Sequence, residues 1–153
     1  MSRAATWTLA IAVGAGPIGA ATAEGLDLGG AVTFGDWSPY ATRYVVARTV
    51  CAWSSGPERH YRVIADTFES PGAFRLVGDL GDTIRYVVRW GDRSGEPTGV
   101  TAGQPSATAY PFDDSLGCPG GGAELELELS SEDADRVPGG VYSSTLTITL
   151  SAE

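Results

Sequence analysis

His60 is the only histidine in the 153-residue sequence, so a hydrolytic site with a serine or cysteine nucleophile would have to use it as the base. It directly follows the turn residues 56–59, a position typical of an exposed and inert histidine. The sequence also lacks the G-x-S-x-G and H-E-x-x-H motifs. It therefore predicts a protein that is not an enzyme and has no catalytic residues.

The acidic residues offer the other candidate chemistry. Asp113 and Asp114 are adjacent, so in an extended segment they point to opposite sides and cannot easily share one substrate. The three glutamates of residues 124–128 share a strand face, which is typical of a solvated surface that discourages edge-to-edge pairing. Neither Asp113-Asp114 nor the acidic run at 132–135 has the spacing of a calcium-binding loop. We expect no metal and no cofactor.

Composition places the chain among acidic globular domains. The formal net charge is -9, and all ten basic residues are arginine. Such a charge disfavours nucleic acid and anionic membrane surfaces as partners. With 42% hydrophobic and 19% charged residues, the chain can build a core of one domain's size.

Residues 1–23 have the features of a signal peptide. Arg3 precedes a short apolar run at residues 6–15, too short to span a bilayer, and Ala21 and Ala23 form a small-x-small cleavage site. A buried N-terminal helix is the alternative interpretation. We therefore expect a domain of residues 24–153 that is exported through the periplasm and secreted or held at the cell surface, with no membrane insertion.

The two cysteines, Cys51 and Cys118, both lie in the expected mature part. An oxidising compartment favours a disulfide between them, which would contribute roughly 4 kcal/mol. Metal binding is a weak alternative because no second Cys or His lies at ligand spacing. Two free buried thiols remain the other alternative.

Period-two alternation dominates residues 24–153 and predicts strands rather than helices. Residues 124–129 alternate Glu and Leu, and residues 145–150 alternate Thr with Leu or Ile. Shorter or less regular strands are expected at residues 31–34, 44–53, 61–65, 73–77 and 84–90.

Ser130 could cap one helical turn through residue 135, and residues 92–116 are expected to form a long connection. About seven strands with one apolar face each predict an all-β fold, a single antiparallel β-sandwich.

Aromatic residues at Trp37 and Tyr40 flank Pro39 and could serve a glycan-binding surface. More often such residues fill a sandwich core or seal its end. A self-contained secreted β-sandwich module that binds a glycan or protein ligand is therefore the alternative function that the sequence leaves open.

Three segments carry a family resemblance. Residues 34–39 (FGDWSP) resemble the F-G-x-aromatic-x-P segment of spore coat protein U domains, a family that includes pilin subunits of archaic chaperone–usher pili. Residues 139–150 (GGVYSSTLTITL) resemble the ending of that family, a Gly-x-Tyr turn followed by an alternating strand. Residues 84–91 (IRYVVRWG) are similar to a strand of the alternate, class 1 fimbrial major subunits.

The resemblance implies an immunoglobulin-like sandwich that lacks its final strand. Tyr142, Leu146, Ile148 and Leu150 would then line a strand-acceptor groove for assembly by donor-strand complementation. Such a non-enzymatic pilus subunit, whether minor, tip or terminating, would have a periplasmic chaperone, an outer-membrane usher and other pilus subunits as partners.

The expected donor arm is shorter than in polymerising subunits of the family. Only Leu26 and Leu28 alternate correctly ahead of the first strand of the mature part, and Gly29-Gly30 follow them. The chain could accept a strand without giving one, or it could be a sandwich complemented by its own backbone.

Overall fold

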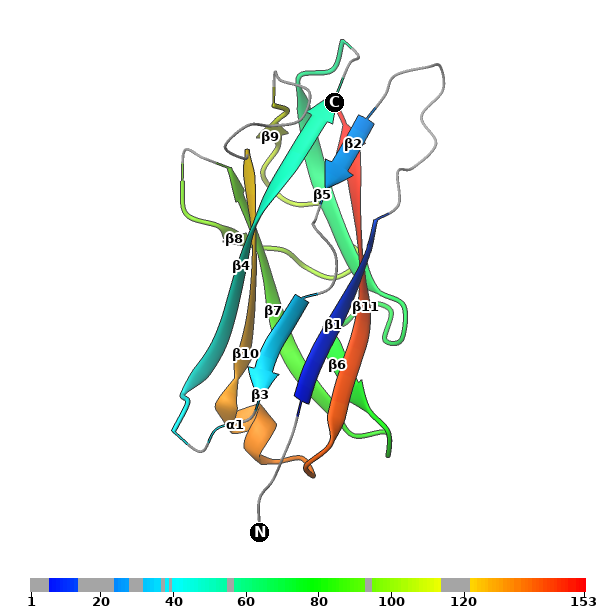
Figure 1. The fold of residues 1–153 in the computed structure, drawn as a ribbon. Coiled ribbons are helices and arrows are strands. Elements are labelled where there is room, and N and C mark those ends of the chain that lie inside the picture. The colour runs from blue at the N-terminus through cyan, green and yellow to red at the C-terminus, as the bar shows by residue number, and fades with distance from the viewer. Residues whose placement is uncertain are drawn as a thin grey trace.

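The computed structural model describes residues 6–13, 24–27, 32–36, 38, 40–54, 57–92, 95–113 and 122–153. These residues form the following elements, labelled as in Figure 1: β1 (Thr6–Val13), β2 (Glu24–Asp27), β3 (Val32–Asp36), β4 (Arg43–Ser54), β5 (His60–Thr67), β6 (Arg75–Gly78), β7 (Thr83–Asp92), β8 (Thr98–Gly99), β9 (Tyr110–Pro111), β10 (Ala123–Ser130), α1 (Ser131–Asp135) and β11 (Val141–Ala152). The expectation of an all-β fold is confirmed.

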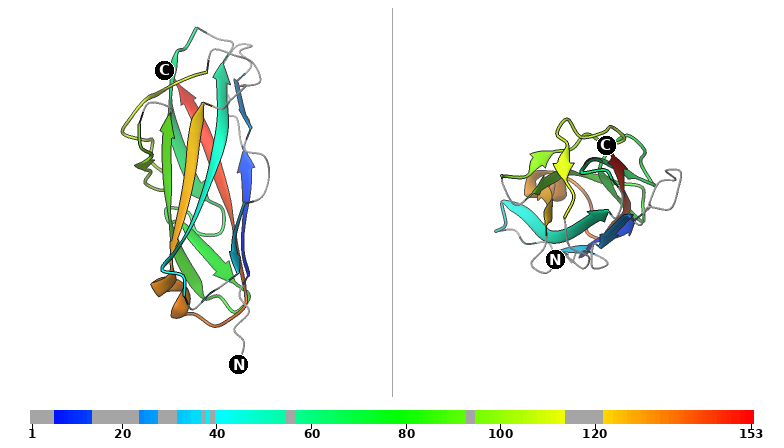
Figure 2. Two further views of the ribbon diagram at one scale, coloured as in Figure 1. Left: turned by 60° about the vertical axis from the view of Figure 1, so that its left-hand side comes forward. Right: turned by 90° about the horizontal axis from the view of Figure 1, so that it is seen from above.

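The strands form two layers that face each other (Figure 2). In one layer β10 pairs with β4 and β7, β2 lies on the outer edge of β4, and β8 pairs with β7. In the other layer β11 pairs with β5 and β6 on one edge and with β1 on the other, and β3 lies beyond β1. The two layers are connected where β6 also pairs with β7.

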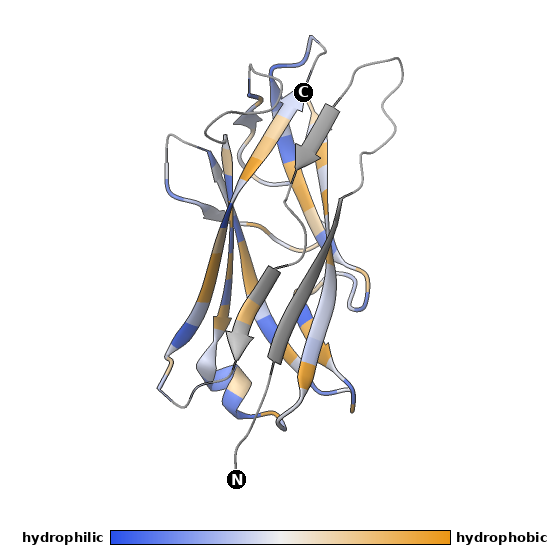
Figure 3. Cartoon of the chain, viewed as in Figure 1, coloured by the Kyte–Doolittle hydropathy of each residue, from blue (hydrophilic) through white to orange (hydrophobic). Residues whose placement is uncertain are grey.

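The core lies between the layers because β5, β7, β10 and β11 bury alternate residues, whereas β4 buries residues only near its two ends. Orange and blue bands alternate along β7 and β10 in Figure 3. Leu125, Leu127 and Leu129 of β10 are fully buried and join Leu146 and Ile148 of β11 in one hydrophobic cluster. The alternation that predicted these two strands is therefore the packing pattern of the sandwich.

On the outer face of β10, two glutamates form ion pairs with one arginine of β7. Arg89 of β7 lies directly opposite Glu126, and its guanidinium is 2.8 Å from the carboxylates of both Glu126 and Glu128. These side chains are partly exposed, so the ion pairs contribute little to stability, typically less than about 1 kcal/mol each. Glu126 and Glu128 thus lie on the outer, partly exposed face of β10, as predicted for a charged strand surface.

The predicted helical turn is confirmed as α1. Ser130 is its N-cap, and the Ser130 hydroxyl accepts a hydrogen bond from the amide of Glu132. Glu132 and Asp133 occupy the first turn, where carboxylates favour the positive end of the helix dipole. Within the described residues, no helix has the length and apolar character needed to cross a membrane.

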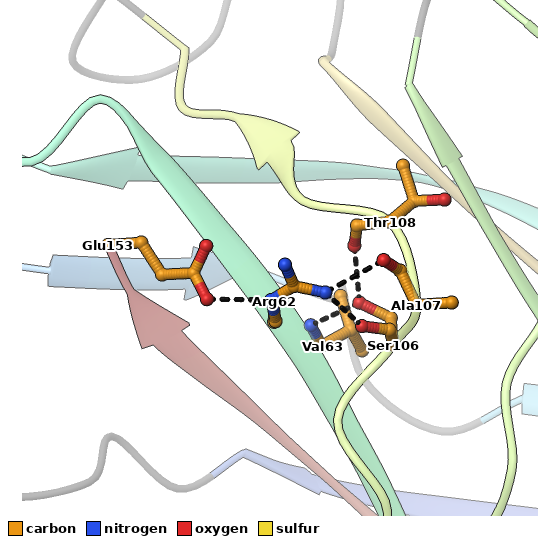
Figure 4. Close-up of polar contacts among 6 residues, drawn as sticks. All are labelled: Arg62, Val63, Ser106, Ala107, Thr108 and Glu153. Atoms are coloured by element: carbon orange, nitrogen blue, oxygen red, sulfur yellow. Dashed lines mark hydrogen bonds and ion pairs between the residues drawn. The ribbon is translucent and has the colours of Figure 1, made fainter.

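The expected long connection contains the two-residue strands β8 and β9 and is anchored to β5 by Arg62 (Figure 4). The Arg62 guanidinium donates to the carbonyl oxygens of Ser106 and Ala107 at 2.8 and 2.7 Å and pairs with Glu153 at 2.6 Å. Ser106 accepts from the amide of Val63 and donates to the carbonyl of Thr108. Arg62 thus helps to hold a connection whose backbone is also tied to β5, by the amides of Gly103 and Ser106, which donate to carbonyl oxygens of β5 at 2.8 Å each.

Candidate strand-acceptor site

β11 has a buried face that spans nearly its whole length. Its buried residues alternate with half-buried or exposed ones and form one row: Tyr142, Ser144, Leu146, Ile148 and Leu150. The four apolar residues of this row are the ones predicted to line an acceptor groove. The structure brings them together, and they belong to the hydrophobic core.

Both edges of β11 are paired in the structure. One edge pairs with β6 at Tyr142–Ser143 and with β5 from Leu146 to Ala152. The other edge pairs with β1 from Val141 to Ile148, and β1 pairs in turn with β3 (Figure 1). We call the place between β11 and β3, which β1 fills, the acceptor position.

β1 differs from the other strands in its direction. It runs parallel to β11, whereas the other strand pairs of the described residues are antiparallel, apart from one isolated bridge between Trp53 and Asp113. Its register sets Trp7, Leu9, Ile11 and Val13 opposite the buried positions of β11: Tyr142, Ser144, Leu146 and Ile148. Large apolar residues therefore occupy alternate register positions along an eight-residue segment.

The segment in the acceptor position is part of the expected signal peptide. Thr6–Val13 lies within residues 1–23, and the alternative of a helix there is wrong because these residues form a strand. Without β1, the backbone N–H and C=O groups of β11 that face it, and those of β3, would have no strand partner. The cleavage of residues 1–23 stays a prediction.

Tyr142 closes one end of the buried row. Its hydroxyl donates to the carbonyl of Pro138 at 2.8 Å, and Tyr142 lies opposite Gly78 of β6. A Cβ atom at Gly78 would lie 2.7 Å from the Tyr142 ring, so glycine leaves the space that the ring occupies. The side chain is therefore a packing residue at the start of β11.

The expected donor arm pairs within its own chain. Leu26 lies in β2 opposite Ala52 of β4, and Leu28 lies outside the described residues. Donation of this arm to a neighbour would require β2 to leave β4. That role stays a prediction.

The other predicted site residues either lie away from the acceptor position or are not among the residues that the structure describes. The Tyr40 side chain is 92% exposed, in the segment before β4, and Trp37 is not among the described residues. Cys51 of β4 is not a free thiol, but Cys118 lies outside the described residues, so their bridge stays a prediction. His60 is exposed at the start of β5. The described residues hold no group of three or more possible metal ligands.

Sequence reasoning missed Glu69, which anchors the loop between β5 and β6 to β11. Its carboxylate accepts hydrogen bonds from the amide and hydroxyl of Thr145, at 2.8 and 3.0 Å, and from the hydroxyl of Ser144 at 3.2 Å. Partial burial raises the pKa of the carboxyl, but these hydrogen bonds outweigh burial, and the pKa lies below its usual value. No local pattern marks Glu69, because its partners are about 75 residues away.

Replacement of Glu69 tests this anchor through pH. A carboxyl whose pKa is lower in the folded state stabilises the fold above its unfolded pKa of about 4.5, and this contribution is lost as pH falls through the folded pKa. We expect Glu69→Gln to be less stable than the parent protein at pH 7, and this deficit to become smaller as the pH is lowered from 7 to 3, as measured by urea unfolding. Glu132→Gln, at an exposed ion pair with Arg136, is the control and should change little at either pH. An equal deficit for Glu69→Gln at both pH values would contradict the anchor.

Comparison with known proteins finds a solved structure with a similar fold. No protein-family model and no curated protein matches the sequence. A chain from the solved structure described as "Chaperone-tip adhesin complex is vital for synergistic activation of CFA/I fimbriae biogenesis" matches with a TM-score of 0.62 and 15% identity, over 85% of this chain and 41% of that chain. The chain thus spans less than half the length of this neighbour. At that identity the likeness is one of fold, and it supports the pilin-like β-sandwich. The more specific resemblance to spore coat protein U domains stays a prediction.

Proposed function

We propose that the protein is a non-enzymatic structural subunit of a chaperone–usher pilus, and that its acceptor position receives a β-strand from a partner. Residues 1–23 would be removed on export, and the periplasmic chaperone would supply the first strand. The usher would then guide its replacement by a strand of a neighbouring pilus subunit at the cell surface.

One observation carries the proposal. The acceptor position lies between two strands of the mature part, β11 and β3, and the segment that fills it belongs to the expected leader. Export would therefore leave a sandwich with one strand position empty. The fold likeness to a chain of a chaperone–tip adhesin complex is consistent with such a partner.

The chemistry required of the incoming strand follows from β11. Its backbone would form the hydrogen bonds that β1 forms, and large apolar side chains at alternate positions would match the buried row from Tyr142 to Ile148. The backbone contacts give affinity whatever the sequence, and the apolar positions fix the register.

Two exported versions of the chain test the proposal. One begins at Glu24 behind a foreign cleavable leader, and its matched control retains residues 6–23 behind the same leader. With a pilus chaperone co-expressed, we expect the first version to co-purify with the chaperone and to be lost as aggregate without it. The control should be soluble alone, because it fills its own acceptor position.

The second candidate function rests on the same strand. If secretion left residues 6–13 on the protein, the chain would be a self-contained sandwich of the kind that binds a glycan or protein ligand. The intact mass of the protein secreted behind its own leader decides between the two. A mass that begins at Glu24 supports the pilus subunit, and a mass that includes residues 6–13 supports the self-contained module.

A further inference from the structure

Two arginines lie directly opposite each other on the outside of the β6–β7 pair. Arg75 of β6 is the register partner of Arg85 of β7, and both side chains are exposed. Cβ atoms of directly opposed residues in an antiparallel pair are roughly 5 Å apart, and like charges there destabilise the sheet. Neither guanidinium has a hydrogen-bond or ion-pair partner among the residues that the structure describes.

A third arginine lies just after the helix α1. Arg136, which follows α1, lines the same cavity of about 280 Å³ as Arg75 and Arg85, together with Thr83 and Val137. Asp133 is the single carboxylate in this described lining, and the ion pair of Arg136 is with Glu132, outside the lining. Three of the ten arginines of a chain with net charge -9 thus surround one cavity.

The same strand provides a contrast. Arg89 lies four residues after Arg85 on the same face of β7, and its charge is balanced by Glu126 and Glu128. The outer surface therefore pairs one arginine of β7 with carboxylates and leaves the other beside a second arginine. An exogenous anion is what would balance Arg75 and Arg85.

A second cavity, of about 290 Å³, adjoins the first through Arg85 and Asp133. Glu128, Ser130 and the half-exposed Val87 also line it. Glu128 and Asp133 accept hydrogen bonds and would repel further negative charge. The two cavities together suit a ligand with one anionic group and several hydroxyl groups.

We propose that the cavity bounded by Arg75, Arg85 and Arg136 is a binding site for an acidic saccharide, with its carboxylate or sulfate group held by the arginines and its hydroxyl groups by Glu128 and Asp133. Guanidinium groups bind planar carboxylates and sulfates through two parallel hydrogen bonds. β6 and β7 pair with each other from Arg75 to Val77, and each continues beside a further strand, β11 at Val77–Gly78 and β10 from Tyr86, so only a short strand edge is left to a peptide backbone. The proposal does not depend on the filling of the acceptor position.

Binding of simple probes to the full chain tests the site. Sodium glucuronate and glucose 6-sulfate are the probes, with glucose, inorganic sulfate and a hexaglutamate peptide as comparisons, titrated by NMR at constant ionic strength. We expect both acidic sugars to bind and to bind more tightly than the comparisons. Arg85→Gln should weaken their binding by about tenfold or more, because charge-assisted hydrogen bonds are lost. Arg48→Gln, at an exposed arginine of β4 that lines neither cavity, is the matched control and should stay within about twofold of the parent chain.

Because Arg75 and Arg85 repel each other, Arg75→Gln should change stability and ligand affinity in opposite directions. Without ligand, Arg75→Gln removes a like-charge pair and should raise Tm by about 1–3 °C, although it weakens binding of the acidic sugars. A residue with a structural role alone would lower Tm.

Four results would overturn the proposal: unchanged affinity in Arg85→Gln, equal binding of glucose, equal binding of inorganic sulfate, or tighter binding of hexaglutamate. The last two would reassign the cavity to a simple ion or to acidic peptides.

Discussion

Deletion of residues 1–23 is expected to lower the free energy of unfolding by about 5 kcal/mol or more. The deletion removes β1, whose eight residues pair with β11, and each backbone hydrogen bond between the two strands contributes about 1 kcal/mol net. That loss is comparable to the entire stability of many domains. Chains of residues 1–153 and 24–153, both produced without export, should therefore differ widely in urea unfolding. We expect the shorter chain to aggregate or to lose its cooperative transition.

A peptide supplied in trans separates loss of this strand from general damage. The peptide of residues 6–13 (TWTLAIAV) should bind the shorter chain and restore a cooperative transition. The same peptide with the substitution Ile11→Asp should fail, because the register partner of residue 11 is the buried Leu146.

The matched control peptide carries Ala12→Asp, opposite the half-buried Thr147, and should retain most of the effect. Equal stability of the two chains without peptide, or equal rescue by both substituted peptides, would contradict an acceptor position beside β11.

The elements that the sequence predicted are those whose pattern is local. The Glu–Leu alternation of β10 and the Thr-rich alternation of β11 each specify a strand with one buried face, and Ser130 marks the start of α1 by its capping hydroxyl. β11 begins at Val141, four residues before the predicted strand, because Tyr142 and Ser144 continue its buried row.

The sequence did not predict β1, because the pattern of residues 6–13 is compatible with a signal peptide as well as with a strand. A short apolar run after an arginine is what a signal peptide requires, and large apolar residues at 7, 9, 11 and 13 are what a strand beside β11 requires. Composition alone cannot separate these descriptions. The parallel pairing with β11 joins residues more than 130 positions apart, and no local pattern encodes it.

The arginine neighbours on the outside of the sheet could not be predicted from the sequence either, because no local pattern encodes which strands pair. Alternation within residues 84–90 puts Arg85 on the strand face opposite the apolar residues, but it gives no partner for that arginine. That Arg75 lies opposite Arg85 follows only from the register of the β6–β7 hairpin. Arg136 lies at the same cavity because of where α1 ends. The anchoring of β11 by Glu69 likewise depends on the path of a loop.

Trp90→Ala is expected to cost about 4 kcal/mol of unfolding free energy, the second largest effect. Trp90 of β7 is fully buried, and its indole N–H donates to the hydroxyl of Tyr61 at 3.2 Å. The two rings meet edge to face, with centroids 6.4 Å apart, and the Tyr61 ring also contacts Phe112 at 4.8 Å. Truncation would leave a cavity and a buried phenol without its donor.

Two further variants divide that cost between packing and hydrogen bonding. Trp90→Phe retains a ring but not the N–H group, so we expect a loss of about 1–3 kcal/mol. Trp53→Ala, at a half-buried tryptophan of β4, removes the same side chain where less of it is packed and should cost less than Trp90→Ala. Urea unfolding at constant m-value measures all three. If Trp90→Ala cost no more than Trp53→Ala, the burial of Trp90 and its contact with Tyr61 would not be what stabilises this part of the core.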